Sequence, residues 1–311
     1  MHCLVTGGAG FIGSHIAQGL LKRGAKVRIF DNFSTGSKDN FAEFRDQIDV
    51  FEGDLRNPSD LAKATRDIEV IFHEAALRSV PRSVDDPTSS NDVNTNGTLN
   101  VLMAARASGV RRVVYASSSS VYGDGNVFPQ VETLRTSPIS PYAVSKLAGE
   151  NYCACFSKTF KLETVGLRYF NVFGPRQHPE SQYAAVIPKF MESALKGTPL
   201  EVHWDGKQSR DFTFIENVVE ANILAAKAKG AAGEAFNIAM GKSISLLYVI
   251  QELEKIVGHR LTRHHSPSRA GDIRKTWADI RKAKKILRYK PAVQFSEGLR
   301  RSWDWFRRTH S

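Results

Sequence analysis

The chain has 311 residues, which is enough to bury a large core, and we expect it to form two lobes. Hydrophobic residues make up 41% and charged residues 24%, as in an ordinary globular protein, and no long apolar run or signal peptide predicts export or a membrane span. The formal net charge of +11 would suit an anionic partner, but no motif that reads DNA or RNA accompanies it, so we predict neither a nucleic-acid nor a membrane partner.

The chain opens on a predicted strand, residues 2–6, that leads directly into a glycine-rich turn. Glycines at positions 7, 10 and 13 permit a tight turn, a close approach of the backbone to a pyrophosphate, and close packing of helix against strand. The helix predicted over 11–22 then offers free N–H groups and a positive dipole end to phosphate. This context of strand, turn and helix predicts a dinucleotide site.

Two carboxylates follow later strands of the same half of the chain. Asp31 ends the strand predicted around 27–30, where it can accept hydrogen bonds from adenosine ribose hydroxyls and would repel a 2′-phosphate. We therefore expect NAD rather than NADP. Asp54 ends the next strand and is placed to accept from the adenine amino group, although a loop-capping role fits it nearly as well.

The first half of the chain alternates short buried strands with helical patterns. Strands around 70–72, 113–116 and 164–168, with a helix over about 94–108 among them, predict right-handed βαβ units and a Rossmann-type, doubly wound parallel sheet. The rhythm becomes irregular after residue 168, which indicates a smaller, mixed α/β lobe toward the C-terminus. We expect the dinucleotide-binding domain to span 1–168, with 212–238 returning to it, and the second lobe to comprise 169–211 and 239–311.

A tyrosine and a lysine stand one helical turn apart, at Tyr142 and Lys146, so their side chains leave the same helix face. Ser140 can cap this helix, and Pro141 suits its first position. The pKa of a free tyrosine is about 10, too high for an efficient base at neutral pH. We expect the lysine ammonium and a positively charged nicotinamide to lower it, so that the phenolate can take a proton from a sugar hydroxyl.

A run of serines, 117–120, follows the strand that precedes this helix. Serines suit ordinary turns, but a hydroxyl here can also hydrogen-bond a reacting oxygen and pass its proton to Tyr142. The chain has three cysteines, Cys3, Cys153 and Cys155. They are too few for a disulfide framework and lack companion ligands for a metal, so we expect a reducing, cytoplasmic location and no metal site.

In this order, the motifs resemble the extended short-chain dehydrogenase/reductase family, specifically its nucleotide-sugar 4-epimerases, over essentially the whole chain. The matching segments also include 73–76, 93–98 around Asn94, 168–176, 209–212 and 269–272. The resemblance implies an NAD-dependent isomerase. It also implies a homodimer that forms through helices near 91–108 and 141–158. It also implies inversion at C4 of a UDP-hexose through a transient 4-keto sugar.

The family pattern also implies roles at matching positions. The catalytic residues would be Ser118, Tyr142 and Lys146. The cofactor contacts would be Gly7, Gly10, Phe11, Ile12, Gly13, Asp31, Asn32, Asp54, Leu55, Ala75, Tyr142, Lys146 and Tyr169. The substrate contacts would be Arg82, Ser118, Asn171, Val186, Arg210, Arg269, Asp272 and Thr276, with the two late arginines on the diphosphate, where guanidinium groups match phosphate oxygens.

Related activities differ at a few of these positions. The serine run lacks the acidic pair of 4,6-dehydratases and the glutamate that decarboxylases place at Ser120, and Asp31 disfavours NADP-dependent reductases. The small Thr276 matches a position where a tyrosine restricts relatives to glucose and galactose, so N-acetylhexosamines are allowed here. UDP-glucuronate 4-epimerases usually have threonine at Asn171, yet that activity stays open. Non-enzymatic, RNA-binding relatives often lose the tyrosine–lysine pair, which is intact here.

Overall fold

The structure is a computed structural model that describes residues 1–177, 185–267 and 273–310. Its centre is a seven-stranded sheet in the order β11-β6-β5-β4-β1-β2-β3, with every pair parallel. The strands are β1 (His2–Thr6), β2 (Lys26–Asp31), β3 (Ile48–Glu52), β4 (Val70–His73), β5 (Arg112–Ser118), β6 (Glu163–Tyr169) and β11 (Glu234–Ile238). The predicted Rossmann-type, doubly wound parallel sheet is therefore confirmed.

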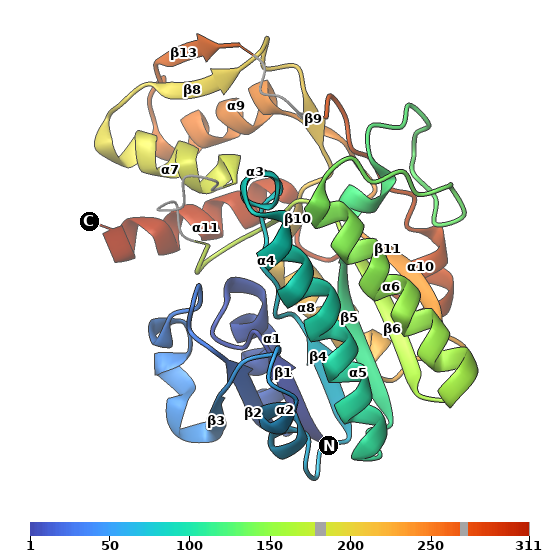
Figure 1. Ribbon diagram of the computed structural model, residues 1–311. Helices are drawn as coiled ribbons and strands as arrows, with labels where there is room; N and C mark the ends of the chain where they lie inside the picture. The colour runs from blue at the N-terminus through green and yellow to red at the C-terminus, as the bar shows by residue number, and fades with distance from the viewer. Residues whose placement is uncertain (178–184, 268–272, 311) are drawn as a thin grey trace.

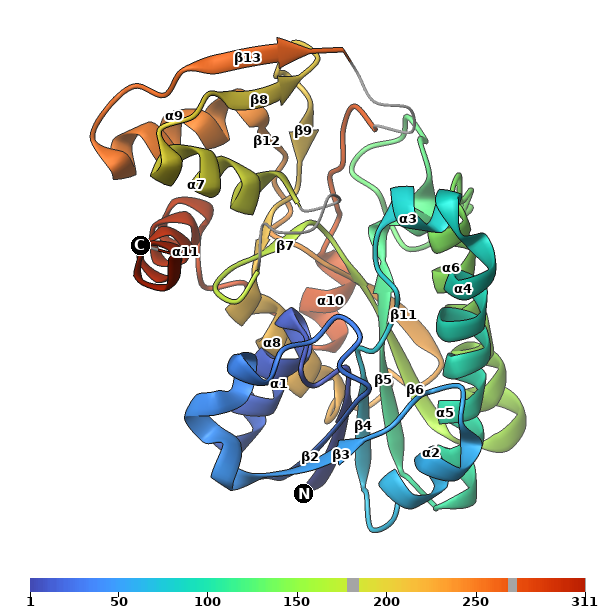
Figure 2. The ribbon, with the colours of Figure 1, turned by 60° about the vertical axis from the view of Figure 1, so that its left-hand side comes forward.

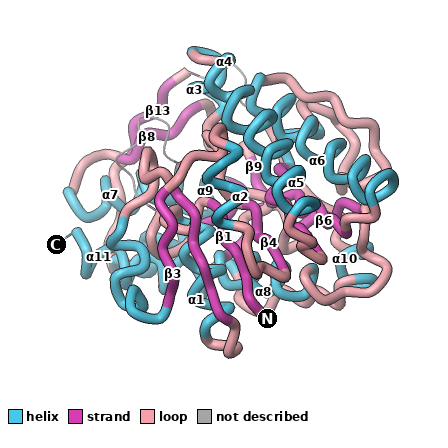
Figure 3. Tube along the Cα trace, turned by 60° about the horizontal axis from the view of Figure 1, so that its bottom comes forward, coloured by secondary structure: helices cyan, strands magenta, loops and turns pink. Residues whose placement is uncertain are grey.

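Helices cover both faces of this sheet (Figures 1 and 3). One face carries α1 (Phe11–Leu21), the 3-10 helix η1 (Lys38–Gln47) and α8 (Ile215–Ala225), and the other carries α2 (Pro58–Ala64), α5 (Gly97–Ala107) and α6 (Pro141–Phe160). Neighbouring residues of a strand point to opposite faces, so Leu4 and Val5 belong to different hydrophobic clusters, one under each helical layer. Burial on both faces explains why the central strands β4 and β5 are almost continuously buried, whereas β3 at the edge is partly exposed.

A smaller lobe sits above the carboxyl ends of the strands (Figures 1 and 2). Its helices and strands are α7 (Val186–Lys196), β8 (Leu200–His203), β9 (Ser209–Arg210), β12 (Ile244–Ser245), α9 (Leu246–Val257) and β13 (Arg263–Ser266), with α11 (Phe295–His310) packed beneath α9. The remaining elements are α3 (Val80–Asp85), α4 (Pro87–Asn91), η3 (Ser119–Tyr122), β7 (Val172–Phe173), β10 (Thr213–Phe214) and α10 (Arg281–Ile286).

The segment predicted as one helix over 94–108 differs from that prediction. A π-helical turn, η2 (Asp92–Asn96), leads without a break into α5. The wider turn surrounds Asn94, whose side chain makes three hydrogen bonds to other parts of the chain. Single π-turns inside helices are frequent at functional sites, where they redirect one side chain.

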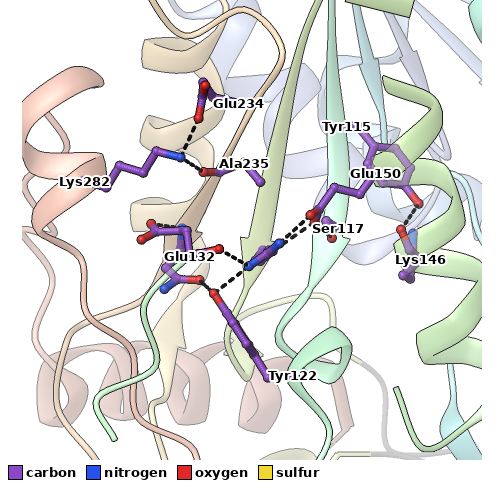
Figure 4. Close-up of polar contacts among 11 residues, drawn as sticks. Tyr115, Ser117, Tyr122, Glu132, Lys146, Glu150, Glu234, Ala235 and Lys282 are labelled. Carbon is purple, nitrogen blue, oxygen red and sulfur yellow. Dashed lines mark hydrogen bonds and ion pairs between the residues drawn. The ribbon is translucent and has the colours of Figure 1, made fainter. Parts of the chain in front are cut away.

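The helix α6 is fixed to the sheet by a buried ion pair. The carboxylate of Glu150 on α6 accepts from Arg168 of β6, with Nη2–Oε1 at 2.5 Å and Nε–Oε2 at 3.0 Å. Ser117 donates to the same carboxylate at 2.8 Å, and Tyr122 lies on the other side of the guanidinium group (Figure 4). This network holds α6, β5 and β6 in one arrangement. Among the described residues, no helix has the length and apolar character needed to cross a bilayer.

Candidate active site

The two halves of the sheet wind in opposite directions from the neighbouring strands β1 and β4. Crevices form at the carboxyl ends of the strands at such a point. A cavity of about 590 Å³ lies here, and it is lined by every residue that was expected to contact the cofactor, as well as by Ser118 and Asn171. The cavity therefore brings the predicted dinucleotide and chemical residues into one space.

The glycine turn is packed too closely for side chains. A Cβ on Gly13 would lie 2.1 Å from the Gly7 oxygen, and one on Gly7 would lie 2.7 Å from the amide nitrogen of Ala75. Gly7 also has a φ of +68°, which L-residues rarely adopt. Gly10 precedes α1 and provides no side-chain cap, so the first N–H groups of the helix face the cavity side of the turn.

Asp31 and Asp54 both line this cavity, but their environments differ. Asp31 accepts from the N–H groups of Ala9 and Phe33, each at 2.9 Å, so it also fixes the glycine turn against β2. Burial raises the pKa of Asp31. Asp54 forms a two-pronged pair with Arg56 at 2.8 and 2.9 Å, which holds the pKa of Asp54 well below its usual range. Carboxylates retain further acceptor sites in such arrangements.

Asn94 connects the cavity wall to the helix that carries the tyrosine. Its amide group accepts from the Leu77 N–H at 2.8 Å, donates to the Leu77 carbonyl at 3.0 Å, and donates to Ser145 Oγ at 3.0 Å. Ser145 in turn donates to the Tyr142 carbonyl at 2.8 Å. As predicted, α6 begins at Pro141, and Ser140 Oγ caps it by accepting from Ala143 N–H at 3.2 Å.

Tyr142 is surrounded by buried polar and charged groups. Burial raises the pKa of Tyr142, while a hydrogen bond with Ser118 and the positive charge of Arg78 act against that rise. The ammonium group of Lys146 donates to the Ala116 carbonyl at 2.9 Å and lies 6.0 Å from the centre of the phenol ring. Burial also lowers the pKa of Lys146 to about 8, with Glu74 opposing this shift.

Ser118 lies at the end of β5, next to the tyrosine. Its oxygen accepts from the Ser120 N–H at 3.2 Å and the Ser120 hydroxyl at 2.9 Å, which leaves the Ser118 proton for the cavity side. A tyrosine, a serine and a lysine beside a dinucleotide-shaped cavity can exchange a proton with an alcohol while a hydride moves to or from the same carbon.

A second cavity, of about 420 Å³, lies under the smaller lobe and shares Asn171 with the first. Val186, at the start of α7, and Arg210, in β9, both line it, as their expected substrate roles require. Arg269 and Asp272 lie outside the described residues. Arg82 is exposed on α3 and lines neither cavity, so the structure does not bring it to the other substrate candidates.

Thr276 lies behind the cavities rather than in their walls. It is 7% exposed, and its hydroxyl accepts from Asn171 Nδ2 at 3.0 Å and from the Asp211 N–H at 3.2 Å. Its size therefore acts on the site through Asn171, a residue that lines both cavities. Ile273 lines the first cavity directly, which the motif comparison did not indicate.

Two charged residues of the first cavity had no predicted role. Glu74 follows β4, and its carboxylate accepts from the Tyr169 hydroxyl at 2.8 Å. Arg78 lies between Leu77, which Asn94 holds, and Ser79, whose φ of +113° is strained for a residue with a side chain. The sequence could have indicated a role for Glu74, because a charged residue that directly follows a buried strand lies at the edge of the sheet where the site forms. The described residues contain no group of three or more side chains suited to a metal ion.

Known proteins resemble this chain over its full length. The sequence pattern of the NAD dependent epimerase/dehydratase family matches residues 3–239. The UDP-glucose 4-epimerase of Mycolicibacterium smegmatis is 37% identical over 312 residues, which cover 99% of each chain. Among solved structures, a UDP-N-acetylglucosamine 4-epimerase of Methanobrevibacter ruminantium has a TM-score of 0.95 at 37% identity, covering 99% of this chain and 98% of that one. A Bacillus cereus UDP-glucuronic acid 4-epimerase in complex with UDP-glucuronic acid and NAD has a TM-score of 0.93 at 35% identity, covering 100% of both chains.

Proposed function

The chain belongs to the NAD dependent epimerase/dehydratase family, and we propose that it inverts C4 of a UDP-hexose through a transient 4-keto sugar. NAD is its cofactor. The observation that carries this proposal is the placement of Ser118, Tyr142 and Lys146 in the same cavity as the glycine turn and Asp31. The substrates we favour are UDP-glucose and UDP-galactose, together with UDP-N-acetylglucosamine and its galactose epimer.

The residues of the first cavity fit the cofactor. The side-chain-free turn at Gly7–Gly13 and the uncapped start of α1 suit a pyrophosphate, Asp31 suits ribose hydroxyls, and Lys146 and Tyr169 lie at the far end. When bound there, NAD would supply the acceptor and donor of the hydride at C4.

The chain itself handles the proton and the substrate. Tyr142 takes the proton of the 4-hydroxyl as the hydride leaves, with Ser118 hydrogen-bonding the reacting oxygen, and the same phenol returns the proton in the second half. Val186 and Arg210 hold the nucleotide in the second cavity. The sugar is then held more loosely than the nucleotide and can rotate about its bond to the diphosphate.

Thr276 provides a test of sugar choice. Because Thr276 is buried against Asn171, a tyrosine at 276 must displace that side chain toward the cavities. We expect Thr276→Tyr to lower kcat/KM for UDP-N-acetylglucosamine at least about tenfold more than for UDP-glucose. Thr276→Ser, which keeps the hydroxyl and adds no volume, should retain both activities. Equal losses on the two sugars in the tyrosine variant would contradict the size argument.

UDP-glucuronate is the second candidate substrate, because the Bacillus cereus enzyme acts on it and matches this fold throughout. A proton NMR assay of the purified protein with separate samples of UDP-glucose, UDP-N-acetylglucosamine and UDP-glucuronate distinguishes the candidates. Conversion of the first two to their C4 epimers is the expected result. Conversion of UDP-glucuronate alone would retain the mechanism and replace the substrate. No conversion with added NAD⁺ would contradict the proposal and favour a dehydratase, a reductase or a non-enzymatic nucleotide- or RNA-binding role.

We also propose a homodimer formed by the outer faces of α5 and α6. Large apolar side chains are exposed there, with Met103 49%, Val144 52% and Tyr152 36% accessible. Exposed apolar residues clustered on neighbouring helices are typical of an interface. Light scattering should give about twice the chain mass of 34.5 kDa. Met103→Glu combined with Val144→Glu should halve that mass, whereas a monomeric unmodified protein would contradict this arrangement.

A further inference from the structure

Glu74 is a carboxylate in the cofactor cavity that has no salt-bridge partner among the described residues. Its only hydrogen bond there comes from the Tyr169 hydroxyl at 2.8 Å. Lys146 attracts it electrostatically, but the ammonium group of Lys146 is directed to the Ala116 carbonyl. A poorly solvated charge without a direct counter-ion is unfavourable by itself and is commonly matched by a charge on a ligand.

Tyr169 and Asn222 form a group of hydrogen bonds next to the Glu74 carboxylate. Asn222 Nδ2 donates to the Val218 carbonyl at 2.9 Å, which sets the orientation of the Asn222 amide. The same nitrogen donates to the Tyr169 oxygen at 2.8 Å. The Tyr169 hydroxyl has two acceptors, Glu74 Oε1 at 2.8 Å and Asn222 Oδ1 at 3.1 Å, and the contact with Glu74 is the shorter one. Asn222 is fully buried and Tyr169 is 7% exposed, so this chain of hydrogen bonds holds the carboxylate in place.

The position of Glu74 in the sheet indicates which part of NAD it faces. The strand β4, after which Glu74 comes, lies on one side of β1, whereas β2, which ends in Asp31, lies on the other. The pyrophosphate belongs at the glycine turn after β1, and Asp31 suits the adenosine ribose. The other half of NAD would then be held by the residues that line the cavity at β4, β5 and β6, among them Glu74, Lys146 and Tyr169.

The charges of the ligands complete the argument. Every ionised group of NAD and of a UDP-hexose is an anionic phosphate except one, the oxidised nicotinamide ring, which is positive. Reduction to NADH removes that charge. We infer that the Glu74 carboxylate complements the oxidised nicotinamide ring and makes this protein bind NAD⁺ more tightly, relative to NADH, than it would without that charge. Such a preference keeps the enzyme in the oxidised form that starts each turnover and favours return of hydride to the keto sugar.

Separate titrations of NAD⁺ and NADH test this inference, which rests on the cofactor and not on the sugar. Calorimetry gives the Kd of NAD⁺, and the fluorescence of NADH gives its Kd, both at pH 7.5. Burial raises the pKa of Glu74 to about 7 and lowers the pKa of Lys146 to about 8, so both groups are mostly charged at this pH. Glu74→Gln keeps an acceptor for Tyr169 and removes the charge. We expect it to weaken NAD⁺ binding about tenfold relative to NADH, which corresponds to a shift of about 30 mV in the potential of the bound couple.

Two control variants separate charge from hydrogen bonding. Glu74→Asp keeps the charge, so it should keep the preference for NAD⁺. Tyr169→Phe removes the hydrogen bond and leaves the carboxylate, so this variant should also keep the preference for NAD⁺. Glu74→Met offers a second neutral variant if the glutamine variant does not fold. The inference would be overturned if the neutral variants changed the Kd values of NAD⁺ and NADH equally. It would also be overturned if Tyr169→Phe lost as much of the preference for NAD⁺ as the neutral variants do. An unmodified protein that binds neither form would instead contradict the cofactor assignment.

Discussion

Tyr142→Phe should lower the rate of epimerisation by about 10²- to 10⁴-fold while NAD stays bound, because the substitution removes one oxygen and keeps the ring that shapes the cavity. The phenol is the group that Ser118 contacts, and Arg78 and Lys146 are the cations of the same cavity. Loss of the base stops both the removal and the return of the proton. The Kd for NAD⁺ should change by less than about threefold, because the glycine turn and Asp31 are unaltered.

Tyr152→Phe is the matched control for this substitution. Tyr152 lies on the same helix α6, but it is 36% exposed and lines neither described cavity. Removal of the Tyr152 hydroxyl should leave the turnover of every UDP-sugar unchanged within about twofold. The measurement is the initial rate by NMR for both variants, with NAD titrated by calorimetry. A near-normal rate for Tyr142→Phe would exclude Tyr142 as the base, whatever the substrate is.

The turn and helix starts that were predicted correctly depend on local sequence. The opening strand, the glycine turn and α1 are specified by consecutive residues whose spacing permits few other structures. The start of α6 is similar, because Ser140 and Pro141 are a cap and a first-turn residue in the correct order. Capping and turn geometry act over a few residues, so the sequence alone was sufficient.

The features that were missed depend on contacts between distant residues. The π-turn around Asn94 follows from its bonds to Leu77 and Ser145, which are 17 and 51 residues away in the sequence. The burial of Thr276 depends on Asn171, 105 residues away. Burial raises the pKa of Tyr142, and the spacing of the tyrosine and the lysine in the sequence does not predict that burial. Residue types indicated the chemistry of the site, whereas its electrostatics required the packed structure.

Glu150→Gln should lower the free energy of unfolding by about 3–5 kcal/mol, the largest effect on stability that we expect. The side chain of Arg168 is only 6% exposed, and the Glu150 carboxylate is the negative charge that faces it. Glutamine nearly preserves the shape, but it replaces an acceptor oxygen with an N–H group that points at other donors. The guanidinium group then stays buried without a direct ion-pair partner among the described residues, which is more unfavourable than the loss of one hydrogen bond.

Urea unfolding of the NAD-bound protein measures this effect, and Glu297→Gln is the control. Glu297 forms an ion pair with Arg300 on the surface of α11, so its neutralisation should change stability by less than about 1 kcal/mol. The double variant Glu150→Leu with Arg168→Met should recover much of the loss, because apolar groups of similar size need no counter-ion. A loss below about 1 kcal/mol for Glu150→Gln would contradict this account. Because α6 carries Tyr142 and Lys146, loosening of the helix in Glu150→Gln should also lower kcat for the UDP-sugar.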